Sequence, residues 1–290
     1  MKWKNSFHPY ALITVLFWSL SYVFTRLALG SFSAFSIGFL RYFFASAVLL
    51  IAAASTKMKR PARKDLPWFA AAGALGFFLY MITFNQGLIT VTASTGSVVI
   101  ATVPVMTALF ALFIYKEDLR LHQWIAILIE FIGVAVLTLM NSIFSVNIGL
   151  LWLFGAAISL SLYNLIQRKL TKTYTALQAS TYSIFFGTLM LMIFLPETLG
   201  EIPGARGLHI FYVAVMGVLS SAAAYAAWAK AFSKAKKTSQ VSNYMFVTPF
   251  ATTLLGFLMA GEIPDRATLL GGSIILLGML VFNFGGKRES

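Results

Sequence analysis

The chain contains ten apolar segments, each roughly 20 residues long and separated from the next by a short break. A helix of that length crosses the roughly 30 Å hydrocarbon core of a bilayer. Only 11% of the 290 residues are charged, whereas soluble domains carry about 25%. The sequence therefore predicts an all-α integral membrane protein with ten transmembrane helices, surrounded by the lipid bilayer. The predicted spans are 9–30, 33–54, 66–88, 91–115, 121–140, 148–169, 175–196, 208–231, 239–260 and 267–285.

The Lys and Arg residues alternate with the predicted spans. They gather before the first span and after the second, fourth, sixth, eighth and tenth, whereas the opposite loops hold only Arg206 and Arg266. Because basic loops stay on the cytoplasmic side of a membrane, we expect both termini to be cytoplasmic and the chain to lie in the plasma (inner) membrane. The same distribution accounts for the net charge of +13 through anionic lipid, so no nucleic-acid partner is expected.

An internal repeat relates the two halves of the chain. Residues 93–117 align with residues 238–262 without a gap, at an offset of 145. Five spans in each half give the two halves opposite directions through the membrane, so we expect two inverted five-helix repeats, 1–142 and 143–290. The functional site of such a protein lies near the bilayer midplane, where the repeats meet. The paired residues include Tyr80 with Tyr225, Pro104 with Pro249, Glu117 with Glu262 and Gly133 with Gly278, and, at an offset of 142, Arg26 with Arg168.

Several segments resemble the EamA-type members of the drug/metabolite transporter superfamily. They are FWSLSYVFTRLAL (17–29), FLRYF (39–43), TVPVMTALFALFIYKE (102–117), VTPFATTLLGFLMAGE (247–262) and LLGGSIILLGMLVF (269–282). The resemblance covers nearly the whole chain, and the order and spacing of the motifs are more specific than any one of them. It implies a central cavity lined by spans of both halves, without the fifth and tenth, and alternating access by rocking of the halves. It does not imply a substrate.

Aromatic and polar residues form stripes on the faces of several predicted spans. An aromatic wall with a few hydrogen-bonding groups suits small organic solutes, although Trp and Tyr also anchor helices at the membrane surface. Trp18 lies about half-way through its span, which disfavours the anchoring role for this residue. The predicted cavity-lining residues are Trp18, Tyr22, Tyr80, Ser94, Ser97, Tyr163, Asn164, Tyr225, Trp228, Asn243 and Tyr244.

Two prolines stand near the middle of their spans. Pro104 and Pro249 each remove a backbone donor and displace the carbonyl four residues earlier, so each is expected to bend its helix. In lipid the freed carbonyl needs a partner, which favours a bend beside protein or a water-filled cavity. We interpret the pair as hinges of a gate, with a static packing kink as the alternative.

Two charged residues lie deep within predicted spans. Glu130 and Arg41 are expected at similar depth, and buried charges in membranes are rare and functional or paired. One hypothesis makes Glu130 a proton carrier, alone or coupled to Arg41. The alternative is a structural ion pair, or a protonated Glu130 bonded to a backbone carbonyl, and the resemblance favours this because the fifth span lies away from the cavity.

The chain has no cysteine, no P-loop and no recognisable hydrolase or metal motif, so no enzyme activity, cofactor or metal is expected. The sequence therefore predicts a secondary transporter that exports small metabolites, such as amino acids or similar polar or aromatic solutes, driven by protons or by exchange. Alternatives in the same fold are multidrug or cation efflux and nucleoside or anionic-metabolite exchange. An alternative of another class is a membrane-embedded enzyme or lipid-handling protein. The substrate, coupling ion and oligomeric state stay open.

Overall fold

A computed structural model describes residues 6–116, 119–140, 147–234 and 243–284. Within these ranges the chain is helical and forms no strand. The first half contains α1 (His8–Ala28), α2 (Ala34–Ser55), η2 (Arg63–Asp65), α3 (Leu66–Gly73), η3 (Ala74–Leu79), α4 (Tyr80–Thr90), α5 (Ala93–Ile100), α6 (Val103–Tyr115) and α7 (Leu121–Leu139). The second half contains α8 (Ile148–Leu170), α9 (Ala176–Leu191), η4 (Met192–Phe194), α10 (Leu195–Glu201), η5 (Ile202–Gly204), α11 (Gly207–Val215), η6 (Met216–Ala223), α12 (Ala224–Lys234), η7 (Asn243–Phe246), α14 (Val247–Ala260) and α15 (Arg266–Phe284).

Several of these elements join end to end into long apolar rods. Within the described residues, seven helical stretches are long and apolar enough to cross a membrane, and three shorter apolar helices cover 121–136, 247–260 and 266–282. The three shorter helices fall in the predicted fifth, ninth and tenth spans. The all-α membrane fold predicted from the sequence is therefore confirmed, with seven of the ten spans meeting the length and composition expected of a membrane helix.

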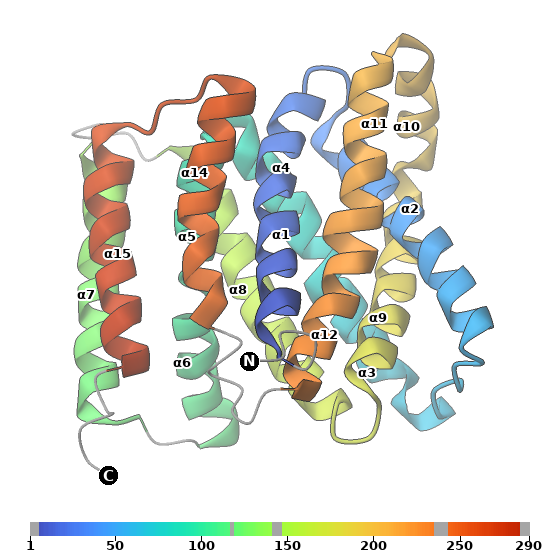
Figure 1. Cartoon of the computed structure of the whole chain (residues 1–290), viewed down its shortest axis with the longest axis horizontal. Coiled ribbons are helices and arrows are strands. Elements are labelled where there is room, and N and C mark those ends of the chain that lie inside the picture. The colour runs from blue at the N-terminus through green and yellow to red at the C-terminus, as the bar shows by residue number, and fades with distance from the viewer. Residues whose placement is uncertain (1–5, 117–118, 141–146, 235–242, 285–290) are drawn as a thin grey trace.

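The two halves run in opposite directions. In Figure 1, α1 begins and α15 ends at the lower end of the bundle, whereas α4 ends at the upper end. At that upper end Thr90 Oγ1, in the last turn of α4, donates a hydrogen bond of 3.0 Å to Asn147 Oδ1, which caps the start of α8. Helix α8 therefore descends where α1 ascends, as inverted repeats require.

The repeat also extends to a backbone detail. Lys116 (φ 54°) and Gly261 (φ 64°) both have left-handed conformations, and both directly follow the helix that carries the repeated proline. They are 145 positions apart, so the same turn ends α6 and the helix α14. The acidic residue that follows Lys116 in the sequence, Glu117, lies outside the described residues.

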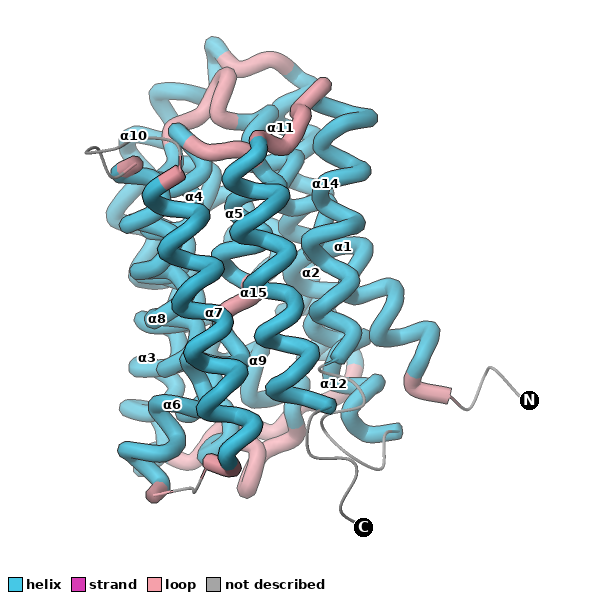
Figure 2. Tube along the Cα trace, turned by 90° about the vertical axis from the view of Figure 1, so that its left-hand side faces the viewer, coloured by secondary structure: helices cyan, strands magenta, loops and turns pink. Residues whose placement is uncertain are grey.

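Helices α7 and α15 form a pair at one side of the bundle. Figure 1 shows them side by side at the left, and Figure 2, viewed from that side, has them in front. The repeat-related Gly133 and Gly278 both lie at this contact. A Cβ on Gly133 would stand 2.7 Å from Ile275 Cγ1, and a Cβ on Gly278 would stand 2.6 Å from Glu130 Cγ. The small residues thus allow the close approach of the two helices.

Helix α1 occupies the centre of the remaining helices. It packs against α4, α5, α11, α12, α14 and η6, which come from both repeats. The largest fully buried side chains include Tyr42, Phe77, Phe84 and Met81. Ile184, Leu191 and Met216 of the second half are equally buried, and Ile275 connects α15 to the same core.

Each proline lies in the first turn of an α-helix that follows another helical segment, and its predicted role as a hinge of a gate stays a prediction. Helix α5 ends at Ile100, and Pro104 is the second residue of the new helix α6. Pro249 is the third residue of α14, which follows the short helix η7. Proline is favoured in a first helical turn because its missing N–H needs no acceptor there. Two residues therefore separate α5 from α6 before Pro104, whereas η7 passes directly into α14 before Pro249.

A loop contact joins the two halves at the lower end. Tyr174 donates a hydrogen bond of 2.7 Å to Asp65 Oδ2 and accepts one of 3.0 Å from the Ala62 N–H. The bond to the carboxylate stabilises the neutral phenol and so raises the pKa of Tyr174 above its usual value. This contact ties the basic loop after α2 to the turn that links α8 and α9.

Candidate functional site

A cluster of aromatic rings lies between the repeats. Trp18 of α1 packs against Tyr225 and Trp228 of α12, with ring centres 5.8 Å and 5.0 Å apart. Tyr225 and Tyr163 both meet Phe77, at 5.8 Å and 5.2 Å. We call Trp18, Tyr22, Phe77, Tyr80, Phe84, Tyr163, Tyr225 and Trp228 the central aromatic cluster.

The second part of the cluster lies on α1 and α4. Tyr22 meets Phe84 edge to face at 5.1 Å, and Tyr80 stacks on the same ring at 5.4 Å. Six of the predicted cavity-lining residues, Trp18, Tyr22, Tyr80, Tyr163, Tyr225 and Trp228, are therefore brought together by the fold. Phe77 contacts Tyr163 and Tyr225, and Phe84 contacts Tyr22 and Tyr80.

Two π-helical segments position the repeat-related tyrosines. η3 ends at Leu79, directly before Tyr80, and η6 ends at Ala223, two positions before Tyr225. Both repeats therefore place a widened turn beside the cluster. Widened turns leave backbone carbonyls free for other donors. Ser159 Oγ donates to the Leu75 carbonyl within η3 at 2.7 Å. η3 is thus bonded to the neighbouring helix α8, and a π-helical segment lies beside the cluster tyrosine in each repeat.

Arg41 of α2 lies against this cluster and is 5% exposed. Its Nε donates a hydrogen bond of 2.9 Å to Ser221 Oγ in η6, and its Cζ lies 5.7 Å from the centre of the Tyr42 ring. Among the described residues it forms no ion pair. The hydroxyl groups of Tyr22, Tyr42, Tyr80 and Tyr225 lie near its guanidinium.

The predicted pair of Arg41 and Glu130 is not formed. Glu130 lies on α7 against Gly278 of α15 and is 3% exposed, and its Oε1 has no hydrogen-bond partner among the described residues. Helix α2, which carries Arg41, lies across the bundle from α7 (Figure 1). Two residues at equal depth in the membrane can lie far apart within the membrane plane. Similar depth was therefore not enough to predict that Arg41 and Glu130 pair.

The predicted polar residues lie on several helices. Ser94 and Ser97 are buried in α5, where Ser97 Oγ donates to the Ser94 carbonyl at 2.7 Å and Ser94 Oγ has no partner among the described residues. Asn164 Nδ2 donates to Thr107 Oγ1 at 3.2 Å, which links α8 to α6. No group of three or more metal-ligating side chains occurs in the part of the chain that the structure describes.

Tyr244 lies away from Arg41, near the lower end of α1. Its hydroxyl is hydrogen-bonded to His8 Nδ1, and its ring meets Phe7 at 6.3 Å. Asn243 begins η7, and its side chain lies outside what the structure describes. Tyr244 is therefore not part of the central aromatic cluster.

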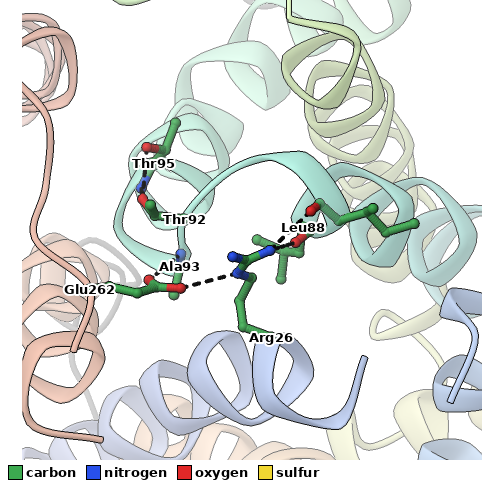
Figure 3. A network of polar contacts seen from close by, with 7 residues as sticks. Arg26, Leu88, Thr92, Ala93, Thr95 and Glu262 are labelled. Carbon is green, nitrogen blue, oxygen red and sulfur yellow. Dashed lines mark hydrogen bonds and ion pairs between the residues drawn. The ribbon is translucent and has the colours of Figure 1, made fainter. Parts of the chain in front are cut away.

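A polar network closes around Arg26 at the upper end (Figure 3). Arg26 Nε lies 3.0 Å from Glu262 Oε1, and its terminal nitrogen donates to the carbonyls of Leu88 and Ile89 at 2.6 Å and 3.0 Å. The second oxygen of Glu262 accepts the Ala93 N–H at 2.8 Å. We call these five residues the upper latch, because they join the ends of α1, α4, α5 and α14.

The backbone after α14 positions the acid of the latch. Gly261 has a φ of 64°, and the Glu262 N–H donates to the Gly256 carbonyl at 3.1 Å. This is the glycine-dependent helix ending in which the chain reverses and caps its own last turn. It turns Glu262 back over the helix end toward Arg26.

The upper latch was not predicted from the sequence. There, Arg26 and Glu262 stand out separately, through their repeat partners Arg168 and Glu117. The signal available was an opposite pair of charges at the outer ends of two spans expected to line the same path. The sequence also gave no reason to single out Tyr42, although it is adjacent to Arg41.

Comparisons with known proteins identify relatives over nearly the whole chain. Residues 6–139 and, separately, residues 147–284 match the EamA-like transporter family. The uncharacterized transporter YdfC of Bacillus subtilis is 29% identical, with 92% of this chain and 87% of the relative covered. A probable terminal-alkyne amino-acid exporter of Streptantibioticus cattleyicolor is 27% identical, with 96% and 95% covered.

Two further matches extend this range. An S-adenosylmethionine uptake transporter of Rickettsia prowazekii is 26% identical, with 88% of this chain and 85% of the relative covered. A solved crystal structure superposes with a TM-score of 0.68 at 18% identity, covering 97% of this chain and 98% of that one. The structural likeness supports the fold, and the named relatives include transporters of both directions.

Proposed function

This chain belongs to the EamA-like transporter family of the drug/metabolite transporter superfamily, and we propose that it is a secondary transporter exporting amino acids or similar small polar or aromatic solutes. The observation that carries the proposal is the convergence of α1, α2, α4, α8 and α12 on one site. There, Trp18, Phe77, Tyr163 and Tyr225 pack together, and the ring of Tyr42 lies 5.7 Å from the Cζ of the buried Arg41. Rings with a few polar groups are the usual lining of a small-molecule site.

Partial exposure of the cluster supports a solute path. Trp18, Tyr80, Tyr225 and Trp228 are only half-buried. The hydroxyls of Tyr80 and Tyr225 also lie near Arg41. Surface that stays accessible among helices of both repeats is where a solute would contact the protein. We place the path between the repeats 1–142 and 143–290, with Ser94, Ser97 and Asn164 along it.

We assign the lower end of the bundle to the cytoplasm of a plasma (inner) membrane protein. The loops between α2 and α3, α6 and α7, and α8 and α9 lie at the lower end (Figure 1) and carry eight of the 22 Lys and Arg residues, which favours that side. The driving force is a proton gradient or exchange, because the sequence has no ATP-binding motif.

Alternating access gives the upper latch a role. With the latch formed, α1, α4, α5 and α14 are held together at the upper end, so an outward-open state must break it. The break before Pro104 is a suitable hinge, because chain between two helical segments changes direction more easily than a continuous helix, and the junction of η7 with α14 before Pro249 is its counterpart in the second repeat. The latch then holds the closed outer gate.

A transport assay tests the function. Purified protein in proteoliposomes is loaded with one unlabelled amino acid and tested for uptake of the labelled form by counterflow, over a panel of amino acids, nucleosides and cationic drugs. We expect saturable counterflow for one or more amino acids. Empty liposomes provide the background, and failure of every solute to exchange would remove the proposal.

A matched pair of tryptophan variants locates the site. Trp18→Ala removes a ring from the central aromatic cluster. Trp68→Ala removes a ring from the first turn of α3, where the ring centre lies 3.2 Å from Lys169 Nζ. We expect Trp18→Ala to raise the half-saturating concentration about tenfold, as loss of an aromatic contact does, and Trp68→Ala to leave it unchanged. Equal effects would place the site elsewhere.

A further inference from the structure

We propose that Arg41 binds the carboxylate of the transported solute, so that the substrates are small carboxylates, amino acids among them, and not cations. This inference rests on the transporter function proposed above and adds the chemical class of its substrate. It starts from the environment of one charge inside the bundle.

The first step is the missing counter-charge. Arg41 is 5% exposed, and a buried charge is stable only when paired or well hydrogen-bonded. Of the acidic residues in the described ranges, only Glu130 lies within an apolar span, and it packs against α15 across the bundle. The others lie in loops or at helix ends: Asp65, Glu197, Glu201, Glu262 and Asp265.

The second step concerns the hydrogen bonds of the guanidinium. Its Nε donates to Ser221 Oγ, and among the described residues no acceptor is bonded to its terminal nitrogens. A guanidinium carries five donors in a planar fork that matches the two oxygens of a carboxylate. The bond to Ser221 holds one edge of the group and leaves the fork for a ligand.

The third step is a second polar group beside Arg41. Tyr42 is fully buried, its ring centre lies 5.7 Å from Arg41 Cζ, and its hydroxyl lies near those of Ser221 and Tyr225. A carboxylate at Arg41 would accept a hydrogen bond from this hydroxyl as well.

The fourth step gives the rest of the solute a place. Tyr225 lies near Arg41, and its ring centre is 5.8 Å from that of Trp18. The Trp18 ring centre is in turn 5.0 Å from that of Trp228. A solute with its carboxylate at Arg41 would extend over these rings. Apolar or aromatic side chains fit this surface, and an ammonium group on the solute could face a ring.

The experiment compares acids with their amides on the wild-type protein. L-phenylalanine, L-leucine and L-methionine are each paired with the corresponding amide, which keeps the shape and the ammonium group and removes the carboxylate charge. 3-Phenylpropanoate and phenethylamine separate the acid from the amine. Binding is measured as the ligand-dependent rise in melting temperature of the purified protein.

We expect at least one acid to bind about tenfold or more tightly than its amide, as loss of charge-assisted hydrogen bonds requires. We also expect 3-phenylpropanoate to bind and phenethylamine not to bind. Equal binding of acid and amide, or no binding of any acid, overturns the proposal. Counterflow of a cationic drug by the same preparation would then leave the transporter function standing, whereas no flux of any solute removes both.

Two variants assign the effect to Arg41. In Arg41→Gln we expect the ratio of acid affinity to amide affinity to fall to about one, because only the acid loses a partner. Arg41→Lys keeps the charge without the fork and should retain part of the difference, which covers the case in which the Gln variant does not fold. A purely structural Arg41 would weaken acid and amide equally in both variants, and that result contradicts the proposal.

Discussion

Arg26 Nε and Glu262 Oε1 lie 3.0 Å apart, although the two residues are 236 positions apart in the chain. The carboxylate also accepts the Ala93 N–H, so its neutral amide isostere would lose the ion pair and weaken two hydrogen bonds. Arg26 is partly exposed, at 30%, and Glu262 is 11% exposed, so solvent screens part of the interaction. We predict that Glu262→Gln shifts the protein toward outward-open states.

Thiol labelling measures this shift. The chain has no cysteine, so Ser97→Cys, one turn below Ala93 on α5, supplies a single buried reporter. We expect Glu262→Gln to raise its labelling rate by a membrane-impermeant maleimide about tenfold, the effect of losing one hydrogen bond to a charged group.

Glu201→Gln is the matched control for the latch variant. Glu201 also accepts a backbone N–H at the upper end, that of Ser33 at 3.0 Å, but it joins α10 to the start of α2. We expect no change in the labelling of Ser97→Cys. Unchanged labelling in Glu262→Gln, or equal changes in both, would contradict a gating role for the upper latch.

The sequence was sufficient for the architecture because hydropathy and repetition report it directly. Apolar length gave the helices, and the pairing of Tyr80 with Tyr225 and Gly133 with Gly278 gave the relation of the halves. It could not show that Pro104 begins a new helix. A proline in an apolar run is compatible with either a bend or a break, and the hydrogen bonds of the preceding turn decide between them.

The contact of α7 and α15 provides a stability prediction. A Cβ on Gly278 would lie 2.6 Å from Glu130 Cγ and 3.0 Å from the Ala126 carbonyl oxygen. Because backbone cannot yield easily, we expect Gly278→Ala to destabilise the protein by about 1–3 kcal/mol, the usual cost of overpacking. The measurement is the melting temperature in detergent, with Gly200→Ala as control because nothing lies within 4 Å of its Cβ position. Equal stability of the two variants would contradict the packing described.

Glu130 provides a prediction about coupling. It lies on α7 against Gly278 of α15, and among the described residues it forms no ion pair with Arg41. We therefore expect Glu130→Gln to leave the pH dependence of transport unchanged. Uptake is measured over an imposed pH gradient and compared with counterflow at equal pH. Loss of pH-driven uptake with exchange intact would restore Glu130 as a proton carrier.

The candidate site was only partly accessible from the sequence. Helical periodicity placed Trp18, Tyr22 and Tyr225 on inward faces, and the fold brings them together. Periodicity gives a direction around one helix axis but no lateral distance between helices. For that reason Arg41 was matched with Glu130 by depth, and its actual partner, Ser221, was not identified.

The repeated left-handed turn gives the last prediction. Lys116 and Gly261 have φ values of 54° and 64°, and a side chain in this conformation costs roughly 1–2 kcal/mol per residue. A Cβ at Gly261 meets nothing within 4 Å, so Gly261→Ala tests backbone strain alone. We expect it to lower stability by about 1 kcal/mol, whereas Lys116→Gly should raise stability by up to about 1 kcal/mol, since glycine's greater freedom in the unfolded chain offsets part of the gain. Gly261→Ala should also speed the labelling of Ser97→Cys, because the same turn holds Glu262 against Arg26. If both substitutions changed stability in the same direction, the two turns would not be equivalent, and the repeat would not extend to the ends of α6 and α14.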